Sequence, residues 1–455
     1  MARRYYLRML PLLERRTRLA FDHPGIYITE THTLFGAYDP CDYGTAAADR
    51  PVDGVPYGYQ MSPWIRFDFG GDGGLPELCM MLLDHYLYTL DNATLRRYYP
   101  LLNGTLAFFY HHYGASSAAE KLRIFPTQAL ETYQCPGWPP TLDACPLNDH
   151  PTVAALHVLT ERALGLPAEF GSPFERAQWQ ALRAALPDLP MAEEDGQTVV
   201  APYEGYPQPN VSIRNSETAE LYSTHPFRLL TLASSRKVSA APRVSLDGEL
   251  SIAMDQPSDP ARLIRVTLAP YRLPRLTPLP STTPTPPCRF LWQSGAAHRD
   301  IAPSLYCLEQ SKRETCRNAD ANTGWTQGVL NAALLGRAAM ASRMVLERSQ
   351  TTPAAGYRFP AFMPHLQDYE PSEDHLANLN TALQLMLLAP ADDQLEAGGV
   401  LLFPAWPCSW DVDFRLAAPR QTFVSAALVN GTLVRLDVDP PERKNAVIVL
   451  PCQDV

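Results

Sequence analysis

Apolar residues recur at helical spacing along most of the chain. Positions i, i+3 and i+4 are repeatedly hydrophobic, which is the pattern of helices that bury one face. Residues 1–19 carry scattered charges and no uninterrupted apolar run, so they predict an amphipathic helix rather than a signal peptide. The other stretches with this periodicity are 75–90, 103–112, 153–164, 174–186, 325–348 and 374–388.

Local signals support several of these helices. Pro76 stands where a first-turn proline is tolerated, and Asp149 or His150 precedes Pro151 as a candidate cap. Asn322 or Thr323 is placed to cap the helix that starts at 325. The connections between helices are long and rich in proline and aromatic residues, which is typical of functional loops.

Two regions interrupt the helical pattern. Residues 272–289 contain six prolines among Ser and Thr, a composition that favours extended polyproline geometry, and we predict that 236–300 is a surface insertion. Near the C-terminus, 422–429 and 432–438 are β-rich and flank Asn430-Gly431, the preferred two-residue hairpin turn. Together with 446–450 they predict a small antiparallel sheet.

Length and charge restrict the class of protein. A chain of 455 residues fits two domains or one large toroid. The net charge of −10, without a long basic run, argues against nucleic acid or an anionic membrane surface as partner. No apolar run approaches the roughly 18 residues that would span a bilayer.

The cysteines and the glycosylation sequons bear on the cellular compartment. The 9 cysteines form no CxxC pair, so no zinc knuckle or thioredoxin-type site is indicated. Cys135/Cys145 and Cys307/Cys316 are close enough for small disulfide loops, but free buried thiols remain the alternative. Asn-x-Ser/Thr sequons favour a secretory or extracellular location, and they occur at Asn92, Asn103, Asn210 and Asn430.

One carboxylate stands out in the segment FPTQALETYQ, residues 125–134. Glu131 is its only charged residue, among apolar and hydroxyl side chains. Burial of a carboxyl group in such surroundings raises its pKa, which is what a general acid needs. The alternative is that Glu131 braces the loop through hydrogen bonds.

Several motifs resemble, in the same order, the catalytic body of the six-hairpin glycosidases. The resemblance is to the inverting α-L-fucosidases of glycoside hydrolase family 95, and it is closer still to glycosidase-like proteins whose activity is unassigned. It covers most of 1–235 and 318–438. The motifs are GLPELCMMLLDHYLYTLD, FPTQALETYQ, ETAELYSTHPF, DANTGWTQGVLNAALLG, and EDHLANLNTALQLMLL followed by FPAWPCSWDV.

The resemblance implies a mainly α fold: an (α/α)6 toroid over 1–415, either complete or incomplete at its N-terminus, followed by a small C-terminal antiparallel β module over 416–455. It also implies a mechanism. Glu131 matches the family's general acid, and Asp320, which precedes the Thr-Gly-Trp motif with two residues between them, matches the general base. An inverting hydrolase needs two carboxyl groups roughly 6.5–9.5 Å apart. The alternative for Asp320 is an ordinary helix-capping aspartate.

The chain departs from the fucosidase pattern before the helix at 75–90. Where those enzymes place two asparagines that orient water, this chain has RFDFGGD, so Asp68 is a second candidate for the base. Further candidates for substrate binding are Glu217, Glu220, His225, Trp325, Arg358, Asp374 and Trp406. Glu217 and Glu220 are three apart and would share a helical face, while the tryptophans could stack on sugar rings or belong to the core.

These features predict a glycoside hydrolase that inverts the anomeric centre of an oligo- or polysaccharide and needs no metal or organic cofactor. Two alternatives remain. A catalytically degenerate carbohydrate-binding protein would explain the missing asparagines. A polysaccharide lyase would use Tyr222 or His225 as base, with Arg358 neutralising a uronic carboxylate.

Overall fold

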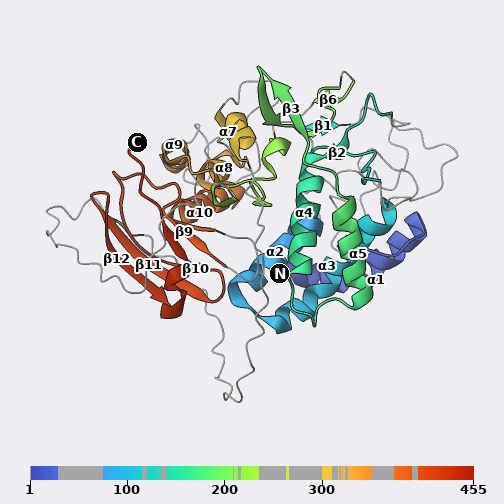
Figure 1. Ribbon diagram of the computed structural model, residues 1–455, viewed down its shortest axis with the longest axis horizontal. Helices are drawn as coiled ribbons and strands as arrows, with labels where there is room; N and C mark the ends of the chain where they lie inside the picture. Colours follow the sequence, from blue (N-terminus) through green and yellow to red (C-terminus); the bar gives the residue numbers. More distant parts are fainter. Residues whose placement is uncertain are drawn as a thin grey trace, which may run out of the picture.

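The computed structural model describes the polypeptide in segments and is mostly helical (Figure 1). The predicted surface insertion lies outside the described residues except for 263–265 and 300. The described residues are 2–28, 75–114, 120–130, 132–134, 141–208, 210–213, 217–234, 263–265, 300–309, 316, 319, 321–322, 326–350, 373–391 and 398–455.

The helices of the first half form packed pairs, seen at the right of Figure 1. α2 packs on α3 and on α4, and α5 packs on α3 and α4. Asp91 caps α3 and Asp149 caps α4, each accepting backbone N–H groups of the first turn. The bounds are α1 Ala2–Phe21, α2 Leu75–Thr89, α3 Asn92–His112, α4 His150–Leu164 and α5 Pro173–Ala185.

The second half contains the remaining described helices. We predicted one helix over 325–348, and this was wrong, because the chain breaks at Gly336, whose φ is +72°. The break separates α8 from α9. The N-cap residue of α8 is Gln327, without a side-chain hydrogen bond, so the predicted cap at Asn322 is wrong, and Thr323 lies outside the described residues. The bounds are α7 Ala302–Glu309, α8 Gly328–Leu334, α9 Ala338–Gln350 and α10 Glu373–Leu387.

The predicted C-terminal hairpin is confirmed. β11 (Thr422–Val429) and β12 (Thr432–Asp439) pair antiparallel around Asn430-Gly431. The sheet extends further than expected, in the order β12-β11-β10-β7, with β10 at Asp411–Ala418. β7 (Leu263–Arg265) pairs parallel with β10, so a short piece of the predicted insertion belongs to this sheet.

The last predicted strand forms, but it joins a different sheet. β13 (Val447–Val449) pairs parallel with β9 (Val400–Leu402), which pairs antiparallel with β8 (Leu388–Pro390). The expectation that 446–450 extends the hairpin sheet was therefore wrong. The remaining strands are short pairs: β1 Tyr133–Gln134 with β6 Ser212–Ile213, β2 Leu147–Asp149 with β5 Tyr203–Glu204, and β3 Met191–Glu194 with β4 Gln197–Val200.

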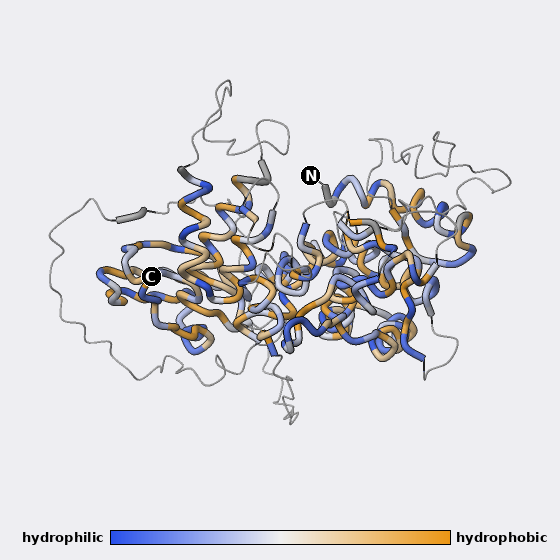
Figure 2. The backbone as a smooth tube through the Cα atoms, turned by 90° about the horizontal axis from the view of Figure 1, so that it is seen from above, coloured by the Kyte–Doolittle hydropathy of each residue, from blue (hydrophilic) through white to orange (hydrophobic). Residues whose placement is uncertain are grey.

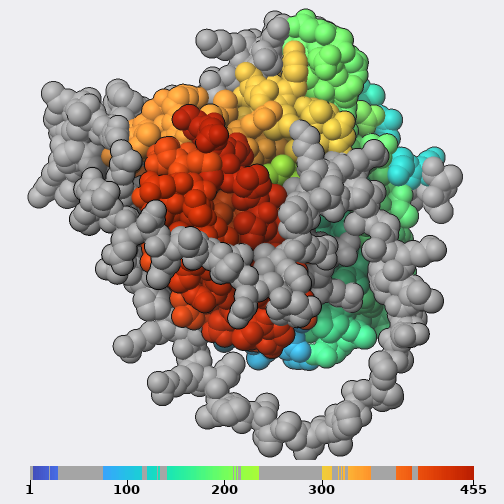
Figure 3. All heavy atoms as spheres, turned by 60° about the vertical axis from the view of Figure 1, so that its left-hand side comes forward, coloured from blue at the N-terminus to red at the C-terminus, as the bar shows by residue number. Residues whose placement is uncertain are grey.

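Two large hydrophobic cores lie side by side. The first contains buried residues from Leu13 to Leu229, and the second contains buried residues from Val200 to Val447. Apolar positions recur along the packed helices and strands of both halves (Figure 2). The helices of 300–350 and the C-terminal strands adjoin on one face of the molecule (Figure 3). Among the described helices, none is both long and apolar enough to cross a bilayer.

The segment 219–230 runs between the two cores. Ala219 and Tyr222 belong to the first core, whereas Leu221 and Leu230 belong to the second. We call this segment, with the residues that contact it, the seam. The β10–β11 turn also joins the halves, because the backbone N–H groups of Arg420 and Gln421 donate to the carbonyls of Leu87 and Tyr88 at the end of α2.

A partly buried charge cluster strengthens the first half. Asp84 of α2 accepts hydrogen bonds from Arg162 of α4 at 2.8 Å and from Arg228 in the seam. Burial disfavours ionisation of Asp84, but the charges of Arg228 and Arg162 outweigh it and lower the pKa of Asp84 to about 2. Arg162 is itself only 2% exposed, so it depends on Asp84 for a counter-charge.

Asp84→Asn is expected to lower the free energy of unfolding by about 3 kcal/mol, because it leaves two guanidinium groups without their shared carboxylate. The folded pKa of Asp84 lies below its ordinary value of 3.8, so its contribution is present above that value and is lost as the pH falls towards 2. Urea unfolding at neutral pH measures the loss. The exposed Arg96–Glu169 pair is the control: Glu169→Gln should cost at most about 1 kcal/mol, and equal losses would contradict the expectation.

Disulfide-bonded cysteines occur in both halves. Cys307–Cys316 confirms one of the predicted small loops, and Cys145 is also disulfide-bonded, although its predicted partner Cys135 lies outside the described residues. Cys408–Cys452 was not predicted and closes a sequence separation of 44. Cys79 is buried with a free thiol.

Because a longer closed loop restricts the unfolded chain more, removing Cys408–Cys452 should cost more stability than removing Cys307–Cys316. The chain-entropy relation gives about 4 kcal/mol for the first and about 2.5 kcal/mol for the second. Paired Cys→Ser variants compared by urea unfolding measure this difference. A larger loss from the Cys307/Cys316 variant would contradict the expectation.

Candidate functional site

The three predicted catalytic carboxylates, Glu131, Asp320 and Asp68, lie outside the described residues, as do Trp325 and Arg358. Asp374 lies in the first turn of α10, and its side chain is not described. The geometry of the site therefore comes from the residues that flank these positions. They include most of the FPTQALETYQ, ETAELYSTHPF and DANTGWTQG segments.

The FPTQALETYQ loop is fixed onto the start of α4. The hydroxyl of Thr127 donates to Asp149 Oδ2 at 2.5 Å, and Ile124 N–H donates to Asn148 Oδ1 at 2.7 Å. Further along, Ala129 and Tyr133 exchange two backbone hydrogen bonds of 3.1 Å. The described residues on either side of position 131 are buried, with Leu130 at 0% and Thr132 at 2% exposed.

Side chains from this loop meet the seam. Tyr133 OH donates to Glu220 Oε1 at 2.7 Å, and the hydroxyl of Thr132 donates to the backbone carbonyl of Glu217 at 3.0 Å. The strand pair of Tyr133 with Ile213 runs beside these contacts. Glu217 and Glu220 do not share a long helical face as predicted, because only a single 3-10 turn forms at Ala219–Leu221, yet both contact the loop.

Among the described carboxyl groups of this region, Glu220 has the largest pKa shift. It is 1% exposed, and its Oε2 atom has no hydrogen-bond partner within the described part of the chain. Burial raises the pKa of Glu220 to about 8, against the opposing effects of its own backbone N–H and of Tyr133. Glu220 is therefore protonated at neutral pH, and its neutral form explains how a carboxyl group is tolerated there.

Aromatic rings pack around Tyr133. Its ring makes edge contacts with Tyr203 and with Tyr206, each at a centroid distance of 5.8 Å. Tyr203 and Tyr206 contact each other at 5.3 Å. Burial, followed by the charge of Glu220, raises the pKa of Tyr133 well above its ordinary value, so its hydroxyl remains a hydrogen-bond donor.

The DANTGWTQG segment joins the seam through a hydrogen bond between Gln327 and His225. The Nδ1–H of His225 donates to the side-chain oxygen of Gln327, the residue before α8, at 3.2 Å. Burial lowers the pKa of His225 to about 4, so the imidazole is neutral at physiological pH. Hydrogen bonds at Tyr133, Glu220, His225 and Gln327 thus gather segments that lie about a hundred residues apart in the sequence.

Arg348 of α9 binds the DANTGWTQG segment through hydrogen bonds. Its guanidinium donates to the side-chain oxygen of Asn322 at 2.7 Å and to the backbone carbonyl of Thr326 at 2.8 Å. Arg348 is 3% exposed, and burial lowers its pKa to about 10. Asn322, predicted as a cap, instead donates to the backbone carbonyl of Met344.

Trp406 does not fit the role of a sugar-stacking platform. It is 0% exposed, packs in the second core, and donates its indole N–H to the carbonyl of Trp410 at 2.8 Å. Trp410 contacts it edge-on at 5.4 Å and is half-buried. The structure thus favours the alternative for Trp406, a core tryptophan.

The remaining polar clusters of the described residues lie away from the predicted site. Within the described part of the chain, no group of three or more His, Cys, Asp or Glu residues could hold a metal ion. His112 ends α3, as predicted, and hydrogen-bonds His23 at 2.9 Å. A groove between α1, α3 and α5 is lined by Glu14, Tyr99 and Glu175, and no predicted site residue contributes to it.

Sequence reasoning missed the residues that join the segments. Tyr133 and Gln327 lie within the quoted motifs, and Asp84 is the only acidic residue in the interior of the apolar α2, which was a signal for a buried ion pair.

No family model matches the chain, and no curated protein matches it significantly.

Glu220→Gln is expected to remove a pH dependence of stability. The folded pKa of Glu220, about 8, exceeds the ordinary value of 4.5, so the folded state keeps a proton that the unfolded chain releases. Wild-type stability should therefore fall by a few kcal/mol between pH 4.5 and 8, at up to about 1.4 kcal/mol per pH unit. Urea unfolding across this range measures the slope, which should be smaller in Glu220→Gln.

Tyr133→Phe provides the matched control. The tyrosine hydroxyl favours the ionised form of Glu220, so its loss should raise the pKa of Glu220 further. The fall in stability should then continue to a higher pH than in the wild type. Parallel stability curves for wild type and Glu220→Gln from pH 5 to 8 would contradict the assignment.

Proposed function

We propose that this protein is a glycoside hydrolase that cleaves a glycosidic bond with inversion. Glu131 is the general acid, and Asp320, or Asp68 in its place, activates water. The substrate class is an oligo- or polysaccharide. The architecture proposed with it is an (α/α)6 toroid, which accords with the mostly helical body and its packed helix pairs.

The observation that supports the proposal is the convergence of three motif segments at the seam. FPTQALETYQ, which contains Glu131, reaches ETAELYSTHPF through Tyr133 and Glu220. ETAELYSTHPF reaches the segment that follows Asp320 through His225 and Gln327. The two catalytic carboxyl groups of an inverting hydrolase lie on either side of one bond, and convergence of these segments would allow Glu131 and Asp320 to meet that requirement.

The seam also has the position expected for a substrate site. Binding sites occur preferentially where two packed bodies meet, because each body holds its own side of the site rigid. Here the segment 219–230 lies between the two cores. Glu217 is half-buried next to Thr132, so it remains a candidate for contacting a substrate hydroxyl.

Glu131→Gln should lower the rate of glycoside hydrolysis by at least about 100-fold, because loss of a general acid commonly costs 10²–10⁴. The measurement is release of the leaving group from a panel of aryl glycosides and oligosaccharides. Glu120→Gln, an exposed carboxylate near the start of the same loop, is the matched control and should retain the wild-type rate. Equal rates for Glu131→Gln and wild type would exclude Glu131 as the acid.

The same experiments separate the alternatives. Asp320→Asn and Asp68→Asn identify the base, since only the base variant should lose activity while its substrate still binds. Proton NMR of the first product gives the anomer and tests inversion. A product with a new carbon–carbon double bond would indicate a lyase, and sugar binding without turnover would indicate a degenerate enzyme.

A further inference from the structure

The four sequons differ in whether the folded chain leaves them accessible. N-glycosylation requires the asparagine amide and the hydroxyl two residues later. Asn430 lies at the tip of the β11–β12 hairpin with φ +48°, followed by Gly431 with φ +72°, a tight two-residue turn. Asn430 and Thr432 are both exposed. Among the described residues, neither side chain has a hydrogen-bond partner.

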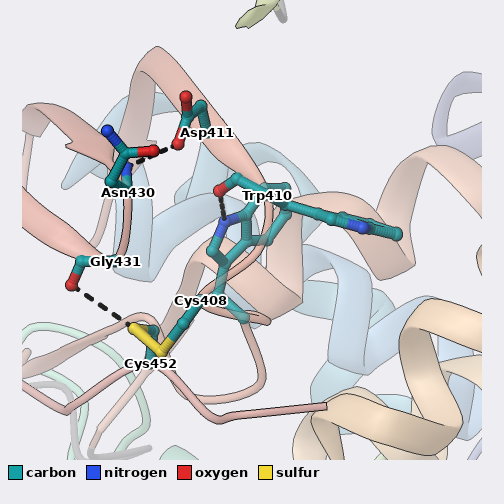
Figure 4. The surroundings of a disulfide bond; sticks show 7 residues. Cys408, Trp410, Asp411, Asn430, Gly431 and Cys452 are labelled. Carbon is teal, nitrogen blue, oxygen red and sulfur yellow. Dashed lines mark hydrogen bonds between the residues drawn. A yellow bond between two sulfur atoms is a disulfide. The ribbon is translucent and has the colours of Figure 1, made fainter. Parts of the chain in front are cut away.

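The turn is held by its backbone rather than by the Asn430 side chain. The N–H of Asn430 donates to Asp411 Oδ1 at 2.7 Å. The carbonyl oxygen of Gly431 lies 3.5 Å from the sulfur of Cys452, which is bonded to Cys408. Figure 4 shows the Asn430 amide pointing away from this disulfide. A group attached to the amide would therefore extend outward without disturbing the contacts that hold the turn.

Asn103 is the opposite case. It lies within α3, where its amide nitrogen donates to Glu175 at 2.7 Å and its oxygen accepts from the indole of Trp179 at 3.2 Å. The hydroxyl of Thr105, the third residue of this sequon, is buried and donates to the carbonyl of Leu101. A glycan on Asn103 would break the contacts between α3 and α5.

The two other sequons lie at the surface but have engaged groups. The amide of Asn92 donates to Glu169, and the hydroxyl of Thr94 donates to Asp91 at 2.6 Å as part of the α3 cap. The amide of Asn210 donates to Asp143 at 3.4 Å. Asn430 is thus the sequon whose acceptor amide and hydroxyl are both exposed and unengaged within the described residues.

The disulfides favour the compartment in which this modification occurs. Cys307–Cys316, Cys408–Cys452 and the disulfide of Cys145 require an oxidising environment. N-glycosylation takes place in the same secretory environment. The Cys408–Cys452 disulfide also holds the turn that carries Asn430.

We propose that Asn430 is an N-glycosylation site and that Asn103 is not. In the reaction, the amide nitrogen of Asn430 forms a bond to C1 of an oligosaccharide carried on a polyisoprenoid pyrophosphate. The bond between C1 and the phosphate oxygen breaks, the amide loses one proton, and the lipid pyrophosphate leaves. The transferase of the secretory pathway reads Thr432 as the hydroxyl residue of the sequon.

The full chain, secreted from eukaryotic cells behind a heterologous signal sequence, tests the proposal. Peptide mass spectrometry after enzymatic removal of N-glycans should show Asn430 converted to aspartate and Asn103 unchanged. Thr432→Ala, which keeps Asn430 and the turn, should lose the glycan at this site, whereas Thr432→Ser should keep it.

Asn103→Gln is the matched control and should leave the glycan mass of the secreted protein unchanged. Secretion and unfolding curves of Thr432→Ala show whether that variant folds, and the Thr432→Ser variant keeps the test interpretable if it does not. Folded, secreted protein with unmodified Asn430, or with a glycan on Asn103, would overturn the proposal.

Discussion

Burying an ionisable group is costly unless opposite charges or hydrogen bonds surround it or the group becomes neutral, and this constraint governs the seam. Asp84 satisfies it by pairing with Arg162 and Arg228. Glu220 satisfies it by keeping its proton. Because the loops at the seam have few strand pairings, these side-chain contacts hold them where backbone ladders cannot. Removing one member of such a contact would leave the other buried without its partner, which would destabilise the fold.

The helices could be predicted because they are local. A repeat of apolar positions at 3.6-residue spacing marks a buried face wherever it packs, and α2, α4, α5 and α10 begin and end within a few residues of the predicted ranges. The exception at Gly336 is also local: the glycine adopts φ +72° and ends α8. By contrast, the partner of β13 was mistaken, because parallel pairing joins distant strands and leaves no short-range signal.

The candidate site could be predicted only in part. Motif order pointed to the segments around Tyr133, Glu220 and Gln327, and the structure joins these segments. Residue type could not show which polar side chains are buried, since Glu217 and Glu220 look alike in sequence although only Glu220 is enclosed. The same limit explains Trp406, because the large apolar face of a tryptophan ring suits a hydrophobic core as well as a stacking surface.

The hydrogen bond between Tyr133 and Glu220 has a consequence for the proposed acid. Tyr133 lies two residues after Glu131 in the sequence, and hydrogen bonds to Glu220 and to the Ala129 backbone fix its position. A protonated Glu220 does this without adding a negative charge. An ionised carboxylate in its place would raise the pKa of any neighbouring carboxyl group and couple the two titrations. Because Glu220 is neutral, its charge does not shift the pKa of the proposed acid, Glu131. This holds up to about pH 8, where Glu220 itself ionises.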